Sequence, residues 1–141
     1  MRCVTNLRSS LASGAPNGNA ADGAEIDIYE GNRQSNRYAT NVHFDGYGKF
    51  HKSINRYIWD KDLHNGQYHT YGLHWTEDFL DFYLDGRRVR REEGRSWIPH
   101  VPHYMIVSGG IFGGDWVDGS VRNDNWPASM FTDHVRAWQE C

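Results

Sequence analysis

Residues 25–30, with the sequence EIDIYE, place three carboxylates in an alternating pattern that is typical of a β-strand. Successive side chains of a strand point to opposite faces, so Glu25 and Asp27 share one face and the two isoleucines take the other. Strict alternation would send Glu30 to the isoleucine face. A β-bulge near Ile28-Tyr29 adds one residue and would return Glu30 to the face of the other acids. The segment therefore predicts a bulged strand with a carboxylate row backed by a core.

A carboxylate row of this kind suits the hydrolysis of glycosidic bonds. One carboxylate attacks or stabilises the anomeric carbon while a carboxylic acid protonates the departing oxygen, and a separation of about 5 Å gives retention. Four strand steps separate α-carbons by roughly 13 Å, so the two glutamate side chains must lean together on a concave, bulged strand. Asp27 would hydrogen-bond one glutamate and keep the two glutamate pKa values apart. The alternative interpretation is a solvated acidic strand face.

Two further motifs follow the acidic segment in the chain. Residues 68–76 and 82–86 read YHTYGLHWT and FYLDG, and residues 126–139 read WPASMFTDHVRAWQ. Together with the acidic segment, they resemble the signature, the hairpin and the closing strand of glycoside hydrolase family 16, the laminarinase, lichenase, agarase and carrageenase group. The acidic segment is similar to the longer, bulged form of the family signature. Three motifs in the family's order argue against coincidence.

The resemblance implies an all-β, concanavalin A-like jelly-roll β-sandwich. It also implies an endo-acting hydrolase that cleaves β-linked polysaccharide, a β-glucan or a galactan, with retention through double displacement. Glu25 would be the nucleophile, Asp27 the assisting acid and Glu30 the acid/base. We expect the intact protein to be extracellular or periplasmic, although the amino terminus of this chain lacks the regions of a secretory signal.

Length departs from the family pattern. A sandwich of this kind takes about 200–250 residues, whereas this chain has 141 and begins shortly before the acidic strand. We therefore expect residues 1–23 to be a poorly patterned segment and loop, and residues 24–141 to be the C-terminal portion of a domain that is incomplete at its N-terminus. Such a chain would expose sheet edges and would not form a stable monomer. The alternative function is an inactive carbohydrate-binding remnant or a lectin-like module on the same sandwich.

The remaining pattern predicts antiparallel strands and no helix of useful length. Leu80, Phe82 and Leu84 are predicted core positions of a hairpin. The basic run RRVRR at residues 87–91 is expected to be a solvated turn, with contact to an anionic polysaccharide as the alternative. Further strands are predicted at 37–45, 68–76, 79–85, 104–111 and 131–138.

Aromatic rings in the predicted loops are candidates for contact with sugars, because sugars present flat C–H faces that stack on exposed rings. For each ring the alternative is packing within a loop. His43, on the predicted strand after the acidic segment, is a further candidate, because family members of the bulged form often bring a histidine on this strand to the acid/base. A hydrogen-bonded structural histidine is the equal alternative. The candidates are His43, Tyr47, Trp59, Trp97, Trp116 and Trp126.

Charge and composition exclude some partners. The net charge of −3, with acidic and basic residues mixed, argues against a nucleic-acid partner. The sequence has no apolar run of the roughly 18 residues that a membrane span requires. Catalysis of the expected kind needs no cofactor. By resemblance, Asp133 is a candidate calcium ligand, but Ca²⁺ takes 6–8 oxygen ligands and we expect its partners to precede residue 1, so calcium binding should be weak or absent.

Overall fold

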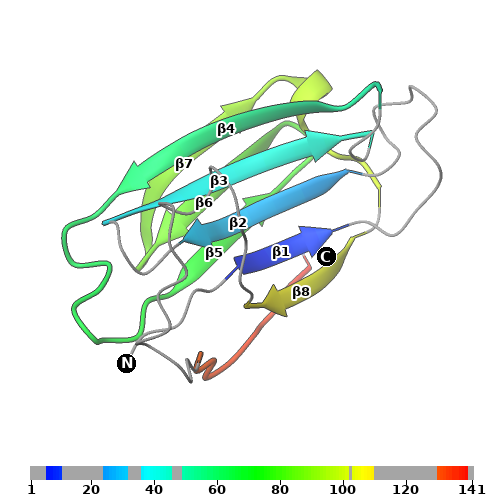
Figure 1. Ribbon diagram of the computed structural model, residues 1–141. Helices are drawn as coiled ribbons and strands as arrows, with labels where there is room; N and C mark the ends of the chain where they lie inside the picture. The colour runs from blue at the N-terminus through cyan, green and yellow to red at the C-terminus, as the bar shows by residue number, and fades with distance from the viewer. Residues whose placement is uncertain are drawn as a thin grey trace.

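A computed structural model describes residues 6–10, 24–31, 36–45, 49–101, 103–109 and 130–139 of the chain. In these ranges the secondary structure is almost entirely β-strand (Figure 1). None of the described helices is long and apolar enough to cross a membrane. The elements are β1 Asn6–Ser10, β2 Glu25–Gly31, β3 Arg37–Phe44, β4 Lys52–Trp59, β5 Tyr71–Trp75, β6 Phe79–Leu84, β7 Arg87–Glu93, the 3-10 helix η1 Arg95–Trp97 and β8 Tyr104–Ser108.

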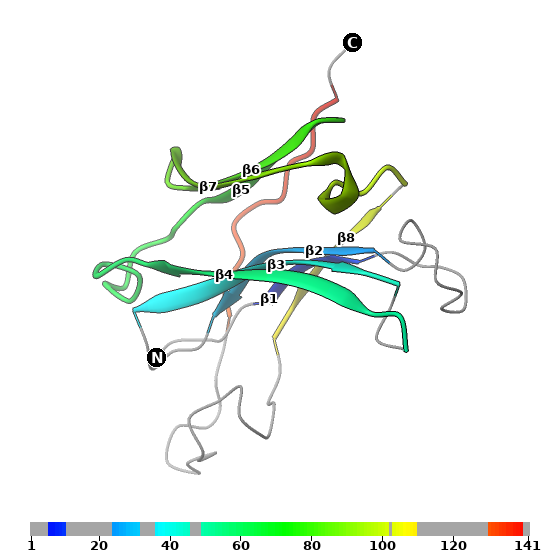
Figure 2. The same ribbon diagram turned by 90° about the horizontal axis from the view of Figure 1, so that it is seen from above.

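The strands form two antiparallel sheets that pack face to face. The larger sheet has the order β4-β3-β2-β1-β8, and the smaller has the order β5-β6-β7. Seen from above, the smaller sheet lies as a second layer over the larger one (Figure 2). The chain crosses from the larger to the smaller sheet between β4 and β5 and returns between β7 and β8. This two-layer architecture confirms the all-β sandwich that the sequence predicts.

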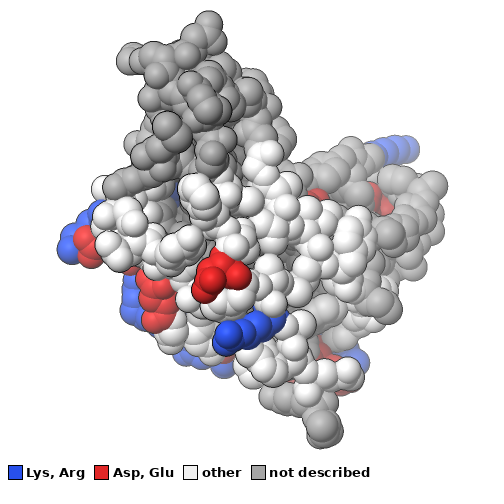
Figure 3. Space-filling view, turned by 90° about the horizontal axis from the view of Figure 1, so that it is seen from below, with Lys and Arg blue, Asp and Glu red and all other residues white. Residues whose placement is uncertain are grey.

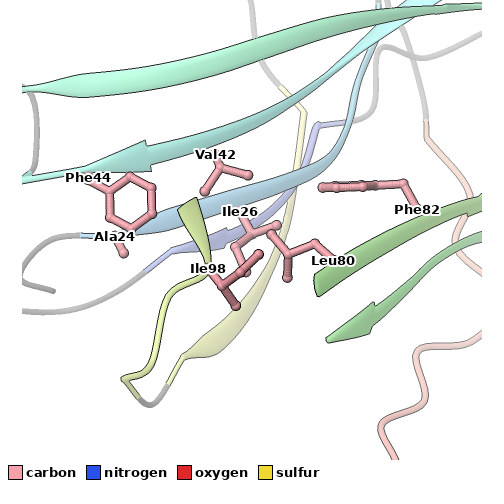
Figure 4. Close-up of a cluster of buried hydrophobic side chains, with 7 residues drawn as sticks. All are labelled: Ala24, Ile26, Val42, Phe44, Leu80, Phe82 and Ile98. Atoms are coloured by element: carbon pink, nitrogen blue, oxygen red, sulfur yellow. The ribbon is translucent and has the colours of Figure 1, made fainter. Parts of the chain in front are cut away.

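The core lies between the two sheets because alternate residues of each strand face inward. Seven side chains from both sheets and from the segment after η1 meet in one cluster (Figure 4): Ala24, Ile26, Val42, Phe44, Leu80, Phe82 and Ile98. A second cluster contains Tyr29, Tyr38, Ile58, Leu63 and Leu84. The predicted core positions Leu80, Phe82 and Leu84 are 0%, 1% and 2% exposed, so this part of the prediction is confirmed.

The basic run at residues 87–91 belongs to a strand, and the prediction of a solvated turn was wrong. Strand β7 pairs with β6, and a register shift at Val89 sets Arg90 opposite Phe82. The guanidinium carbon of Arg90 lies 4.9 Å from the Phe82 ring centroid. Arg90 is buried because Glu92 and Thr40 supply acceptors for its N–H groups. Local composition does not reveal these partners.

Two other segments differ from the expected pattern. Residues 131–138 were predicted to form a strand, but in the described part of the chain they pair with no neighbour and carry exposed side chains such as Phe131 and Trp138. A strand needs a hydrogen-bonded neighbour, so apolar alternation alone does not create one. Strand β8 ends at Ser108, earlier than the predicted strand 104–111. Strand β1 had no counterpart in the sequence pattern, yet it lies between β2 and β8.

We expect Leu80→Ala to destabilise the fold strongly. Leu80 is fully buried in the first core cluster, and truncation of such a residue costs about 2–5 kcal/mol through lost transfer energy and the cavity left behind. Urea unfolding followed by tryptophan fluorescence would measure the loss. Met105→Ala is the matched control, because Met105 is 49% exposed and its truncation should change stability by less than about 0.5 kcal/mol. Equal losses for the two variants would contradict the assigned core.

Candidate functional site

A bulge in β2 brings the three acids to one face of the larger sheet. Against β3, Asp27 pairs with Asn41 and Glu30 pairs with Ala39, so the two residues between the acids on β2 stand opposite the single residue Thr40 on β3. The register with β1 shifts at the same place. One extra residue therefore stands between Asp27 and Glu30, as the spacing of the acids predicts.

The acids share their face with alternate residues of β3 and β4. Directly paired residues of neighbouring strands point to the same side of a sheet. The face consists of three rows across β2, β3 and β4. These rows are Glu25, His43 and Ser53; Asp27, Asn41 and Asn55; and Glu30, Ala39 and Tyr57. Ile26 and Val42 point to the other side, into the core. The face is therefore polar where the opposite side of the same strands is apolar.

The central acids of this face are buried. Asp27 is 1% exposed and Glu25 is 6% exposed, whereas Glu30 is half-buried. Asn41 donates a hydrogen bond from Nδ2 to Oε2 of Glu30, which fixes the orientation of that carboxylate. Nε2 of His43 lies 3.2 Å from Oδ2 of Asp27. Each described contact holds an acid through a side chain of the adjacent strand β3.

His43 extends the contact network to a second histidine. Nδ1 of His43 lies 2.8 Å from Nε2 of His51, and the two rings stack with centroids 5.1 Å apart and an interplanar angle of 13°. Burial and the neighbouring His43 lower the pKa of His51, while Glu25 acts in the opposite direction. The sequence placed His43 on the carboxylate face but gave no indication of His51. Alternation back along β4 from Ser53 is the signal that could have found it.

The predicted aromatic candidates lie in different parts of the structure. Trp59 is 66% exposed and pairs with Arg37 at the end of β4, on the carboxylate face by alternation. Trp97 packs against the core cluster, with its ring centroid 5.8 Å from that of Phe44, so the structure does not bring it to that face. The candidates Tyr47, Trp116 and Trp126 lie outside the described residues.

The sequence pattern missed Tyr57, an exposed aromatic residue on the same face. Tyr57 is 50% exposed and stands two residues before Trp59 on β4. The guanidinium carbon of Arg37 lies 4.5 Å from the Tyr57 ring centroid and 5.3 Å from the Trp59 ring centroid. A guanidinium at such distances is attracted to the ring faces. The alternation of aromatic residues along β4 could have revealed the pair.

Asp133, the candidate calcium ligand, lies in the exposed segment 130–139. Its side chain is 78% exposed, and Oδ2 lies 3.2 Å from Nδ1 of His134. Ca²⁺ requires 6–8 oxygen ligands, and one carboxylate beside an imidazole does not supply them. Among the described residues there is no group of three or more histidine, cysteine, aspartate and glutamate side chains that could hold a metal ion. The residues described around Asp133 therefore do not fit a calcium site.

Comparisons with known proteins identify a family that this chain matches in sequence. The sequence model of the glycosyl hydrolases family 16 matches residues 9–132. The chain is 28% identical to glucan endo-1,3-beta-glucosidase A1 of Niallia circulans over 87% of this chain and 20% of that protein. This curated relative is five times as long as the aligned part.

Solved structures share the fold at lower identity. A family 16 enzyme from the Bacteroides ovatus mixed-linkage glucan locus, solved with a product, superposes with a TM-score of 0.56 at 19% identity, over 74% of this chain and 47% of that chain. The kappa-carrageenase of Pseudoalteromonas carrageenovora, solved with an oligotetrasaccharide, gives a TM-score of 0.58 at 17% identity, over 77% and 45%. These neighbours confirm the jelly-roll sandwich. The chain spans about half the length of the solved structures that it matches.

Proposed function

Because the chain belongs to the glycosyl hydrolases family 16, we propose that it acts as an endo-acting glycoside hydrolase on a β-linked polysaccharide, a β-glucan or a galactan. The observation that carries the proposal is the bulge in β2, which sets Glu25, Asp27 and Glu30 on one face of the sheet. A solvated acidic strand would not need the burial of Asp27 at 1% exposure. A buried carboxylate is costly, so the burial of Asp27 on this face favours a functional role over a solvated acidic surface.

The proposed mechanism is double displacement with retention. Glu25 attacks the anomeric carbon, and Glu30 gives its proton to the oxygen that leaves. Glu30 then removes a proton from water, which attacks the glycosyl-enzyme and releases Glu25. Asn41 supports this assignment because its hydrogen bond fixes one oxygen of Glu30. The steps require no cofactor, and we propose that the intact protein acts outside the cell or in the periplasm, where polysaccharide is met.

A panel of polysaccharides tests this proposal. The purified chain would be incubated with β-1,3-glucan, mixed-linkage β-glucan, agarose and kappa-carrageenan, and the products separated by size. We expect oligosaccharides of intermediate length, as internal cleavage produces, and proton NMR of fresh product should show the β-anomer first. Binding to a polysaccharide without release of any reducing end would favour the lectin-like alternative. Initial appearance of the α-anomer would contradict retention.

We expect Trp59→Ala to weaken polysaccharide binding. An exposed ring near the carboxylate face can stack on a sugar, and a well-placed aromatic contact contributes about 1–2 kcal/mol, so KM should rise roughly tenfold with little change in kcat. Trp138→Ala is the matched control, because Trp138 is 83% exposed but belongs to the segment 130–139, outside the strands that form the carboxylate face. A similar KM for both variants would argue against Trp59 as a binding residue.

A further inference from the structure

Asp27, His43 and His51 form a connected row of polar side chains that reaches from β2 to the start of β4. Oδ2 of Asp27 lies 3.2 Å from Nε2 of His43, and Nδ1 of His43 lies 2.8 Å from Nε2 of His51. Asp27 and His43 are 1% and 8% exposed, and His51 is half-buried. The two rings are nearly parallel, at 13°. Both nitrogens of the middle ring are thus engaged by side chains.

The row restricts the hydrogen positions of His43. Oδ2 of Asp27 is in electrostatic contact with Nε2 of His43. An ionised carboxylate attracts an N–H and repels a bare ring nitrogen, so this contact favours a hydrogen on Nε2. In the neutral ring the other nitrogen, Nδ1, then carries none and must accept. The group within reach of Nδ1 is Nε2 of His51, which donates when it carries the hydrogen. His51 therefore supports the tautomer of His43 that presents its Nε2–H to Asp27.

We propose that His51 is a positioning residue of the carboxylate site: through His43, it holds the 3.2 Å contact between His43 and Asp27 and thereby the place of Asp27 between Glu25 and Glu30. This inference rests on the proposed function only where it concerns turnover. The effect on His43 itself does not depend on catalysis. His51 touches no reacting atom in this arrangement and acts through His43.

The surroundings of His51 favour its uncharged ring. The described groups that face His51 are His43 on β3 and Glu25 on β2, with Asp27 beyond His43, while the neighbouring Lys52 is exposed. Burial and His43 lower the pKa of His51, so the ring stays uncharged at neutral pH. An uncharged His51 with its hydrogen on Nε2 can donate that hydrogen to Nδ1 of His43.

Three substitutions of His51 separate positioning from packing. His51→Gln places an amide where Nε2 stands, so it keeps a donor to His43 but cannot be protonated. His51→Phe keeps a stacked ring without a donor, and His51→Asn is too short to place its amide at the Nε2 position. His100→Gln is the matched control, because His100 is exposed in the loop after η1.

Nitrogen-15 NMR of labelled histidine in the full chain is the first measurement. We expect the hydrogen of His43 on Nε2 in the wild type, in His51→Gln and in the control. In His51→Phe and His51→Asn a bare, buried Nδ1 would lack its donor, so a mixture of tautomers is expected. The wild-type distribution in all variants would overturn the proposal, whether or not the chain cleaves any polysaccharide.

Turnover at neutral pH is the second measurement. His51→Phe and His51→Asn should lower kcat/KM about tenfold, the effect expected from one lost hydrogen bond, whereas His51→Gln should stay within about twofold because it keeps the donor. Equal losses in all three variants would indicate packing alone and overturn the proposal. Inactivity of the wild type would count against the proposed function and leave the NMR result to decide the role of His51.

Discussion

Replacing Glu25 with Gln should abolish most hydrolysis of a β-linked polysaccharide, and replacing Glu30 with Gln should do the same. An amide keeps the size of the side chain but can neither attack the anomeric carbon nor exchange a proton with the leaving oxygen. Removal of a nucleophile or of an acid/base typically costs about 10³-fold or more in turnover. Initial rates on the preferred substrate from the polysaccharide panel would measure the loss.

The double variant Glu25→Gln, Glu30→Gln should lose little more than either single variant. Residues that act in one reaction sequence are not additive, because the second removal eliminates a step that the first has already stopped. Glu93→Gln is the matched control, since the Glu93 side chain is 66% exposed on β7 and its loss should leave turnover unchanged. Small, independent losses of turnover at Glu25 and Glu30 would contradict their assignment as nucleophile and acid/base. Circular dichroism of each variant would verify that the sandwich is intact.

The carboxylate face could be predicted because it depends on local spacing. Alternation along residues 25–28 fixes two faces, and an acid at position 30 needs one extra residue to join the first two. The pairing of Asp27 with Asn41 and of Glu30 with Ala39 confirms that β2 has one extra residue between the two acids. The same reasoning found the core row of Leu80, Phe82 and Leu84, because strand period and apolar residues agree there.

The remaining contacts could not be predicted because they depend on which strands become neighbours. His51 lies one position before β4 and meets His43 only through the register of β3 with β4. Arg90 is fifty residues from Thr40 in the chain, and composition alone assigned its basic run to solvent. Charge provides no better guide, because acidic and basic side chains lie near one another on the described surface in Figure 3. Sequence patterns fix faces, whereas partners across strands follow from topology.

Arg90→Met should destabilise the protein more than an equivalent change at the surface. The Arg90 guanidinium donates to the backbone oxygen and to Oγ1 of Thr40, at 2.8 and 2.9 Å. It also lies 2.9 Å from Oε2 of Glu92, and the side chain of Arg90 is fully buried. Removing it leaves the Glu92 carboxylate and two Thr40 oxygens without this donor. Breaking a buried pair in this way costs about 3–5 kcal/mol.

The double variant Arg90→Met, Glu92→Leu should recover most of that loss. Two apolar side chains remove the uncompensated charge, and such replacements of buried ion pairs are often close to neutral. Arg87→Met is the control on the same strand: its partner Asp60 lies 2.9 Å away, but the Arg87 side chain is 62% exposed, and surface pairs contribute only about 0–1 kcal/mol. Urea unfolding at pH 7 would compare the three variants with the wild type. If Arg90→Met lowers the free energy of unfolding no more than Arg87→Met does, the Arg90 guanidinium is not held between the sheets in solution. If the double variant remains as unstable as Arg90→Met, the loss of stability comes from the Thr40 oxygens rather than from the charge of Glu92.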